Sequence, residues 1–392
     1  MLGASLPAAA WPSHRSPPFL GTLLAAMQSR AAVQTGARRV AVEEMSLPDL
    51  LDDDMAVLEV EANGMCGSDW EQYRGRQSSG GWVRFPVVPG HETVGRIHAA
   101  GERFAARWGV APGDRVAVNS LVSCGACRHC LAGRRLFCAE RFVYGYTPAT
   151  LWPGLWGGYA QHMLLRPNTI LYRLDETASA EDAVLFNPLA AGFDWLCRAG
   201  ELRVGDTVVI IGAGQRGLCS VVAAVEAGAA RVILAGRGRH MWKLDLAREL
   251  GATHVVDLDR EALAPAVAEI TGGDMADVAL DTTPVATEPV RMAIDSVRPE
   301  GVVVLGGIKG SEAGVDGLSP DRLCARAITV RGVVGVSDRA KEQAVGVILS
   351  RRFPLNRLHT HTLPLEDIDR ALRIMGGEVV GEEALHVTIT CR

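Results

Sequence analysis

Several features that would place this chain in a special class are absent from its sequence. No apolar run reaches the roughly 18 residues that a membrane-spanning helix needs. The 40 Lys and Arg residues are outnumbered by 45 Asp and Glu residues and are scattered, so no basic stripe is available to follow a nucleic acid backbone. Aromatic residues make up only 5% of the chain. We therefore expect neither a membrane nor a nucleic acid as partner, and a small molecule as substrate.

The length and composition indicate two globular domains preceded by an unstructured extension. The 392 residues exceed what one hydrophobic core usually organises, and 48% of them are hydrophobic. Residues 1–26 are interrupted by prolines at positions 7, 12, 17 and 18 and are expected to be disordered. They lack the order of segments found in a secretory signal, which predicts a cytoplasmic protein. Met27 opens the first expected strand and is an alternative start of the native chain.

Four of the nine cysteines have the spacing of a metal site. In a reducing compartment cysteines serve metals or catalysis more often than disulfides. The pattern C-x2-C-x2-C-x7-C is formed by Cys124, Cys127, Cys130 and Cys138. Four thiolates at this spacing favour a closed tetrahedral zinc site, which supports structure and performs no chemistry. An iron–sulfur site and four unrelated buried cysteines are the alternatives.

A glycine-rich turn between an expected strand and an expected helix predicts a dinucleotide site. The apolar run 207–211 leads into a turn and then into the helical stretch 218–227; the turn consists of Gly212, Ala213, Gly214, Gln215, Arg216 and Gly217. Gly212 permits the tight turn, Gly214 lets the backbone approach a pyrophosphate, and Gly217 lets the helix pack on the strand. The amino terminus of the helix then faces the phosphates.

Strands and helices alternate beyond this turn. Further strands are expected at 231–235, 254–256, 278–280 and 301–305, with a helix at 241–250 after the second strand. This alternation is typical of a doubly wound parallel sheet, the Rossmann fold. The alternative is a Rossmann fold whose cofactor site is vestigial.

The end of the second strand favours NADP over NAD. An NAD site usually has an acidic residue about 20 positions after the glycines, where this chain has Gly236 followed by Arg237 and Arg239. Guanidinium groups can hold a 2'-phosphate. Alternatively, these arginines are only solvated and the ribose is held by other groups.

Two further segments complete an ordered set of motifs. They are Gly64-Met65-Cys66-Gly67-Ser68-Asp69 and Gly90-His91-Glu92. With the four cysteines and the glycine turn in this order, residues 28–392 closely resemble the zinc-dependent medium-chain alcohol and polyol dehydrogenases. The resemblance implies an α/β protein with a mainly β, GroES-like catalytic domain at 27–185, whose zinc lobe lies at about 120–140. It also implies a Rossmann domain at 186–345 and a return segment at 346–392.

The resemblance also implies the chemistry of the site and the assembly. Cys66 and His91 would be ligands of a catalytic zinc, Asp69 and Glu92 would orient the ligands, and Ser68 would relay the substrate proton. A zinc with an open position lowers the pKa of a bound alcohol, and hydride passes to the nicotinamide. A homodimer or homotetramer is expected, with the sheet edge at 328–336 as a candidate contact.

Two departures from the family pattern affect this site. Asn187 stands where relatives have a Cys or Glu as third ligand, and an amide oxygen binds zinc more weakly than thiolate or carboxylate. We therefore expect a site of Cys66, His91, Glu92 and water, with a site that lacks zinc as the alternative. Glu71 stands where many relatives have a histidine that passes on the proton. A carboxylate could accept this proton, or Glu71 is a solvated surface group.

Three functions remain open at this point. The first is a zinc-dependent dehydrogenase or reductase for a secondary alcohol, polyol, aldehyde or ketone. The second is a zinc-independent NADPH-dependent reductase of an alkene or quinone, which Asn187 makes conceivable and which Cys66 and His91 argue against. The third is a non-catalytic protein that binds the cofactor without turnover.

Overall fold

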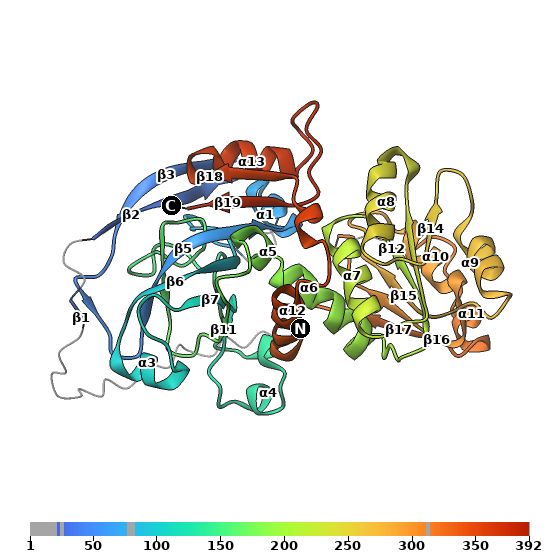
Figure 1. Ribbon diagram of the computed structural model, residues 1–392, viewed down its shortest axis with the longest axis horizontal. Helices are drawn as coiled ribbons and strands as arrows, with labels where there is room; N and C mark the ends of the chain where they lie inside the picture. The colour runs from blue at the N-terminus through green and yellow to red at the C-terminus, as the bar shows by residue number, and fades with distance from the viewer. Residues whose placement is uncertain (1–21, 24–26, 77–82, 311–313, 392) are drawn as a thin grey trace, which may run out of the picture.

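The computed structural model describes residues 22–23, 27–76, 83–310 and 314–391. The expected disordered extension, residues 1–26, lies mostly outside this described part. Its two described residues differ from the expectation, because strand β1 (Thr22–Leu23) pairs antiparallel with β4 (Leu50–Leu51). Figure 1 shows two lobes side by side, one built on a mixed sheet and the other on a parallel sheet between helices.

The first lobe is built on a seven-stranded sheet in the order β11-β7-β6-β5-β19-β18, with β10 also paired to β5. Its strands are β5 (Ala56–Met65), β6 (Glu92–Ala100), β7 (Arg115–Val118), β10 (His162–Leu165), β11 (Leu171–Arg173), β18 (His361–Pro364) and β19 (Val387–Thr390). Strand β5 is buried along almost its whole length because it has neighbours on both sides and side chains packed on both faces. The sheet thereby forms the centre of a mainly β domain, as predicted.

Smaller elements surround this sheet. The hairpin of β2 (Gln28–Gly36) and β3 (Arg39–Ser46) covers one end, and β8 (Leu121–Val122) pairs with β9 (Phe142–Val143) at the base of the cysteine lobe. The short helices are α1 (Gly67–Tyr73), α3 (Glu102–Trp108), α4 (Arg128–Leu131) and α5 (Ala180–Ala183). Helix α3 ends at Gly109, which has a φ of 62° and forms a left-handed cap.

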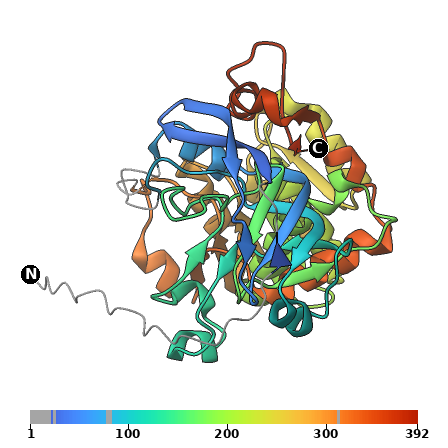
Figure 2. The ribbon, with the colours of Figure 1, turned by 90° about the vertical axis from the view of Figure 1, so that its left-hand side faces the viewer.

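The C-terminal segment returns to the first lobe. Strand β19 pairs antiparallel with β5, with Val387 opposite Met65, and β18 pairs parallel with β19. Helix α13 (Ile368–Met375) lies beside strand β3, as Figures 1 and 2 show. Residues more than 300 positions apart in the chain therefore hold the end of β5 in place, and Cys66 follows directly after that end.

The second lobe is a doubly wound parallel sheet in the order β14-β13-β12-β15-β16-β17. Its strands are β12 (Thr207–Ile211), β13 (Arg231–Gly236), β14 (His254–Asp257), β15 (Ala276–Asp281), β16 (Val297–Leu305) and β17 (Thr329–Gly332). Its helices are α7 (Gln215–Glu226), α8 (Met241–Glu249), α9 (Leu263–Thr271), α10 (Glu288–Ser296) and α11 (Pro320–Ala325). The predicted Rossmann fold is confirmed. Strand β16 is longer than expected at its amino end, and helix α7 begins earlier, at Gln215.

Two helices lie between the sheets. Helix α6 (Phe186–Phe193) is buried at every position, continues into a π-helical turn (Asp194–Ala199), and packs against α7 and α12 (Asp338–Ser350). The Asp194 carboxylate is buried and receives two hydrogen bonds from Arg198, at 2.6 and 2.9 Å. One continuous apolar core therefore runs from the first lobe through α6 into one face of the Rossmann sheet.

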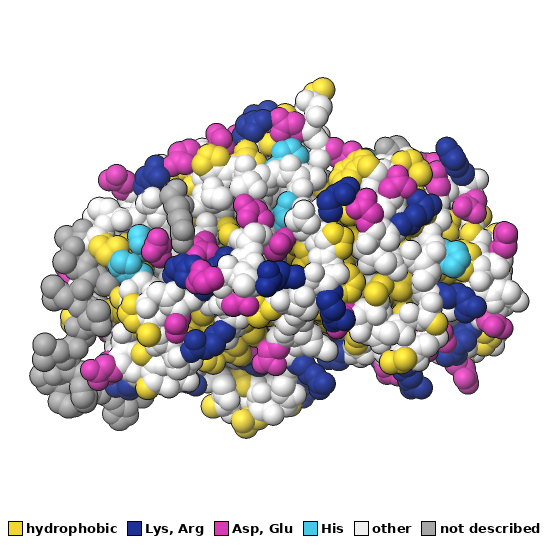
Figure 3. Space-filling view, in the orientation of Figure 1, with side chains coloured by type: hydrophobic (Ala, Val, Ile, Leu, Met, Phe, Trp, Pro, Cys, Tyr) yellow, Lys and Arg dark blue, Asp and Glu magenta, His cyan; other side chains and the backbone are white. Residues whose placement is uncertain are grey.

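The surface in Figure 3 shows acidic and basic side chains interspersed over the face in view. Among the helices in the described part of the chain, none combines the length and the hydropathy that a membrane crossing requires. Within the described residues, β17 is one of the two edge strands of the Rossmann sheet, and β14 is the other. Val330 in β17 is 39% exposed, and Val334, just beyond the strand, is 52% exposed.

Replacing Ile389 with Ala tests the role of the returning strand. Ile389 is fully buried in β19, and truncation of such a side chain costs about 2–5 kcal/mol because a cavity remains. We expect the free energy of unfolding, measured by chemical denaturation, to fall by an amount in this range. Val380→Ala is the control, since Val380 is fully exposed and its truncation is expected to change stability by less than about 0.5 kcal/mol. Equal effects of the two variants would contradict the account.

Candidate active site

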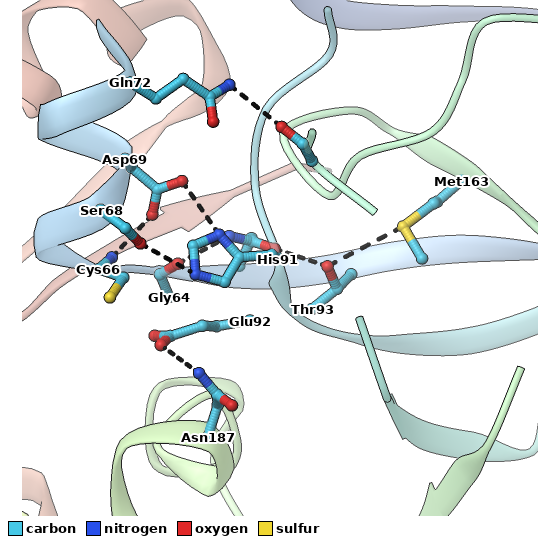
Figure 4. A network of polar contacts seen from close by, with 12 residues as sticks. Gly64, Cys66, Ser68, Asp69, Gln72, His91, Glu92, Thr93, Met163 and Asn187 are labelled. Carbon is cyan, nitrogen blue, oxygen red and sulfur yellow. Dashed lines mark hydrogen bonds and ion pairs between the residues drawn. The ribbon is translucent and has the colours of Figure 1, made fainter. Parts of the chain in front are cut away.

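Two neighbouring strands bring three potential metal ligands together. Cys66 follows β5 directly and caps α1, while His91 precedes β6 and Glu92 begins it. One ligand atom from each of these three buried residues lies within 4.8 Å of the others. Figure 4 shows Cys66, His91 and Glu92 around one common space. Gly64 keeps this space open, because a Cβ atom at that position would lie 2.9 Å from Glu92 Oε2.

Asp69 orients two of these ligands. Its Oδ2 accepts a hydrogen bond from the Cys66 backbone N–H at 2.8 Å, and its Oδ1 lies 3.2 Å from His91 Nδ1. His91 Nε2 lies 3.4 Å from the Ser68 hydroxyl. A carboxylate on one ring nitrogen of a histidine directs the other nitrogen towards a metal. Asp69 therefore contacts both Cys66 and His91 and is placed to orient them.

The ionisable groups in this space, Cys66, His91 and Glu92, shift one another's pKa values. Burial raises the pKa of the Cys66 thiol, but the Arg216 guanidinium and His91 outweigh this effect and lower the pKa to about 5. Burial and the neighbouring Cys66 raise the pKa of Glu92 to about 7. Burial alone would lower the pKa of His91, but Tyr146 and Asp69 raise it above its usual value. The centre thus favours a thiolate at Cys66 beside a cation.

The side chain of Arg216 points away from the expected cofactor site, although the residue belongs to the glycine turn. We expected it to contribute to cofactor binding, yet its side chain extends from the first turn of α7 into the ligand cluster. Nη2 lies 3.3 Å from Cys66 Sγ and 3.2 Å from Glu92 Oε1, and Nη1 donates to the Asn187 carbonyl at 3.1 Å. No local pattern in the sequence indicates this direction, because the contact crosses from one domain to the other.

Asn187 also differs from the expected third ligand. Its side-chain amide nitrogen donates to Glu92 Oε1 at 2.7 Å, as Figure 4 shows. The atom of Asn187 that faces Glu92 is thus the amide nitrogen, a donor, and not the amide oxygen that could bind a metal. Asn187 therefore positions the Glu92 carboxylate and presents a donor to it.

The expected acceptor of a relayed proton is engaged elsewhere. Glu71 forms hydrogen bonds with Arg74 at 2.8–3.2 Å and lies 3.8 Å from Arg76. Tyr146 lies next to His91 in this space. Its ring centroid lies 5.4 Å from that of His91, and its hydroxyl bonds to Ser68. Of the scarce aromatic residues, most near the motifs fill the core, as Phe142, Tyr144 and Trp156 do.

The four-cysteine lobe has the geometry of a tetrathiolate site. The sulfur of Cys124 lies 3.8 Å from that of Cys130 and 3.6 Å from that of Cys138, and the sulfurs of Cys127 and Cys130 are 3.5 Å apart. A tetrahedral zinc bonded to four sulfurs holds them about 3.8 Å apart. All nine cysteines of the chain are free thiols. Backbone N–H groups of Ala126 and Cys127 lower the pKa of Cys124, which favours its thiolate.

The glycine turn has an open space for phosphates. Gly212 has a φ of 111°, and a Cβ atom on Gly217 would lie 1.7 Å from the Gly212 carbonyl oxygen, so neither position accepts a side chain. Gly214 caps α7, and a Cβ atom there would meet nothing within 4 Å. Helix α7 therefore presents its amino terminus to an open space, where Ala213 and Gln215 flank Gly214.

The end of β13 carries the expected basic residue. Gly236 is buried against Ala213 and Leu244. The side chain of Arg237 is 60% exposed, and its Nη1 lies 3.7 Å from Asp259 Oδ1. The Arg239 side chain lies outside the described part of the structure.

Comparison with known protein families agrees with this geometry. Residues 52–176 match the alcohol dehydrogenase GroES-like domain, and residues 217–350 match the zinc-binding dehydrogenase domain. A probable alcohol dehydrogenase of Mycobacterium tuberculosis is 40% identical over 365 residues, covering 92% of this chain and 98% of the relative. The chain belongs to the zinc-type medium-chain dehydrogenase/reductase family.

More distant relatives and solved structures extend this assignment. An erythritol/L-threitol dehydrogenase of Mycolicibacterium smegmatis is 28% identical, with coverage of 92% of this chain and 97% of the relative. The solved structure of an alcohol dehydrogenase from Thermotoga maritima has a TM-score of 0.83 at 27% identity, covering 93% of this chain and 100% of that protein. The resemblance to this family predicted from the ordered motifs is confirmed, and the chain is an oxidoreductase of the alcohol dehydrogenase type.

Both metal positions of the family fit the residues present. The four sulfurs lie within 4.8 Å of one another, and three of their separations, 3.5–3.8 Å, are close to the spacing around a tetrahedral zinc. In the second group, Glu92 Oε2 is buried with no hydrogen-bond partner among the described residues, and thiolate, imidazole and carboxylate are all zinc ligands. Three protein ligands leave the open position that a catalytic zinc requires.

Replacing Cys138 with Ser tests the structural site. Cys138 is fully buried, and loss of one thiolate should release the zinc and unfold the lobe, because metal binding there contributes folding energy. Elemental analysis should show one zinc fewer per subunit, with a lower melting temperature. The exposed Cys324 lies outside both ligand groups, so Cys324→Ser should change neither quantity. An unchanged zinc content in Cys138→Ser would contradict a tetrathiolate site.

Proposed function

We propose that the protein transfers a hydride between a secondary alcohol, polyol, aldehyde or ketone and NADP(H), with a catalytic zinc held by Cys66, His91 and Glu92. The observation that carries this proposal is the contact of Arg216 with Cys66 and Glu92. Arg216 belongs to the dinucleotide-binding turn, so the ligand cluster and the cofactor site adjoin each other. Hydride transfer needs this closeness of substrate and nicotinamide.

The side chains around the centre divide the remaining work. When bound, zinc supplies Lewis acidity that lowers the pKa of a substrate hydroxyl. Ser68 is placed to hydrogen-bond the substrate hydroxyl, and through its contact with Tyr146 it would pass the proton along a chain of hydroxyl groups, each releasing one proton as it accepts another, in place of Glu71. Asp69 and Asn187 hold His91 and Glu92 in position. Enclosure between the two domains excludes water from the hydride step.

Cys66→Ala tests this function directly. We expect zinc to fall from two ions per subunit to one and the turnover of secondary alcohols and polyols, followed through reduced nicotinamide, to fall on the order of 100-fold or more. Cys324→Ala, an exposed position outside both ligand groups, should keep both values. Full turnover in Cys66→Ala would instead indicate a zinc-independent reductase, and cofactor binding without turnover in the native enzyme would indicate a non-catalytic protein.

The preference for NADP is proposed from the end of β13. Gly236 offers no carboxylate to the ribose. The Arg237 guanidinium is exposed, and its Nη1 lies as far as 3.7 Å from Asp259 Oδ1. We expect Arg237→Met to lower kcat/KM for NADP⁺ about tenfold relative to NAD⁺, because a charge-assisted contact to a phosphate is lost. Arg248→Met, which removes a charge paired with Asp245 on the outer helix α8, is the control. An unchanged cofactor ratio in Arg237→Met would contradict the proposal.

We also propose a homodimer or homotetramer in which the β17 edge contacts a second copy of the chain. The exposed Val330 and Val334 support this surface, because an open strand edge favours pairing with another strand.

A further inference from the structure

Arg216 and a metal ion need the same two atoms. Its Nη2 lies within hydrogen-bonding reach of Cys66 Sγ and Glu92 Oε1, and these two residues are members of the three-residue ligand group. A zinc ion bonds to sulfur at about 2.3 Å and to a carboxylate oxygen at about 2.0–2.2 Å. A zinc bonded to these atoms could therefore be no farther than about 5–6 Å from the guanidinium nitrogen. Two cations at that separation repel each other strongly where water is scarce.

The guanidinium is held in this position by more than the two ligands. Nη1 donates to the Asn187 carbonyl at 3.1 Å, and the Trp195 ring centroid lies 5.7 Å from the guanidinium carbon. Asn187 in turn donates to the carboxylate oxygen that Arg216 contacts. The arginine and the asparagine thus form one connected group, and both direct hydrogen-bond donors towards Glu92.

We propose that Arg216 is a built-in competitor of the catalytic metal: its guanidinium neutralises Cys66 and Glu92 when the centre holds no metal, and zinc enters only by displacing it. The inference rests on the proposed zinc site at Cys66. It predicts that the catalytic centre binds zinc reversibly and more weakly than the four-cysteine lobe, whose sulfurs have no such competitor among the described residues.

Equilibrium zinc titration of the full-length protein tests this competition. Wild type, Arg216→Met and Arg248→Met are dialysed at a series of buffered free zinc concentrations, and bound zinc per subunit is measured by elemental analysis. Methionine keeps much of the length of arginine and removes its charge. We expect the second zinc to bind Arg216→Met at least about tenfold more tightly than wild type, because a charge-assisted contact with each of two ligands is removed. Arg248→Met should bind like wild type, and the first zinc should be unaffected in all three.

Two further variants locate and explain the effect. Adding Cys66→Ala to Arg216→Met should abolish the second zinc, which places that ion at the catalytic centre. Arg216→Lys keeps a cation and should bind the second zinc less tightly than Arg216→Met, which also provides a test if the methionine variant does not fold. Equal affinities of wild type, Arg216→Met and Arg216→Lys would overturn the competition and leave the proposed zinc site intact. Absence of a second zinc from every variant would overturn both.

Discussion

Two buried acidic groups lie next to each other where the domains meet, and a cation has to compensate their charge. The Cys66 thiol and the Glu92 carboxyl come from adjacent strands of the first lobe. The Arg216 guanidinium reaches them from the Rossmann domain. An uncompensated charge in such a place is strongly unfavourable. The requirement for a cation therefore joins the metal centre, the dinucleotide turn and helix α6 into one arrangement.

The scaffold explains how these groups are held. The central strand β5 ends at Cys66, and β19 from the far end of the chain pairs along that same end. Helix α6 brings Asn187 to Glu92 and packs against α7, which carries Arg216. Side chains on rigid elements with hydrogen-bonded neighbours can keep the narrow geometry that catalysis requires. The centre is thus supported from both lobes and from four separate segments of the sequence.

The sequence predicted those parts of the molecule in which function depends on local pattern. The spacing of the four cysteines and the strand, glycine turn and helix at 207–227 are short-range signals, and the structure has the corresponding geometry. The directions of Arg216 and Asn187 depend on contacts across the domain junction, which no local pattern contains. Glu71 is a different case, because its partner Arg74 lies only three positions further along, at the C-cap of the same helix, a local spacing that the sequence does contain.

Anomalous diffraction at the zinc absorption edge, from crystals of the full-length protein equilibrated with zinc, tests the central claim most directly. The account predicts two zinc peaks per subunit, one among the sulfurs of the four-cysteine lobe and one bounded by Cys66, His91 and Glu92, with the Arg216 guanidinium moved away from the second. A single peak, in the cysteine lobe alone, or a second zinc with Arg216 still bonded to both Cys66 and Glu92, would contradict it.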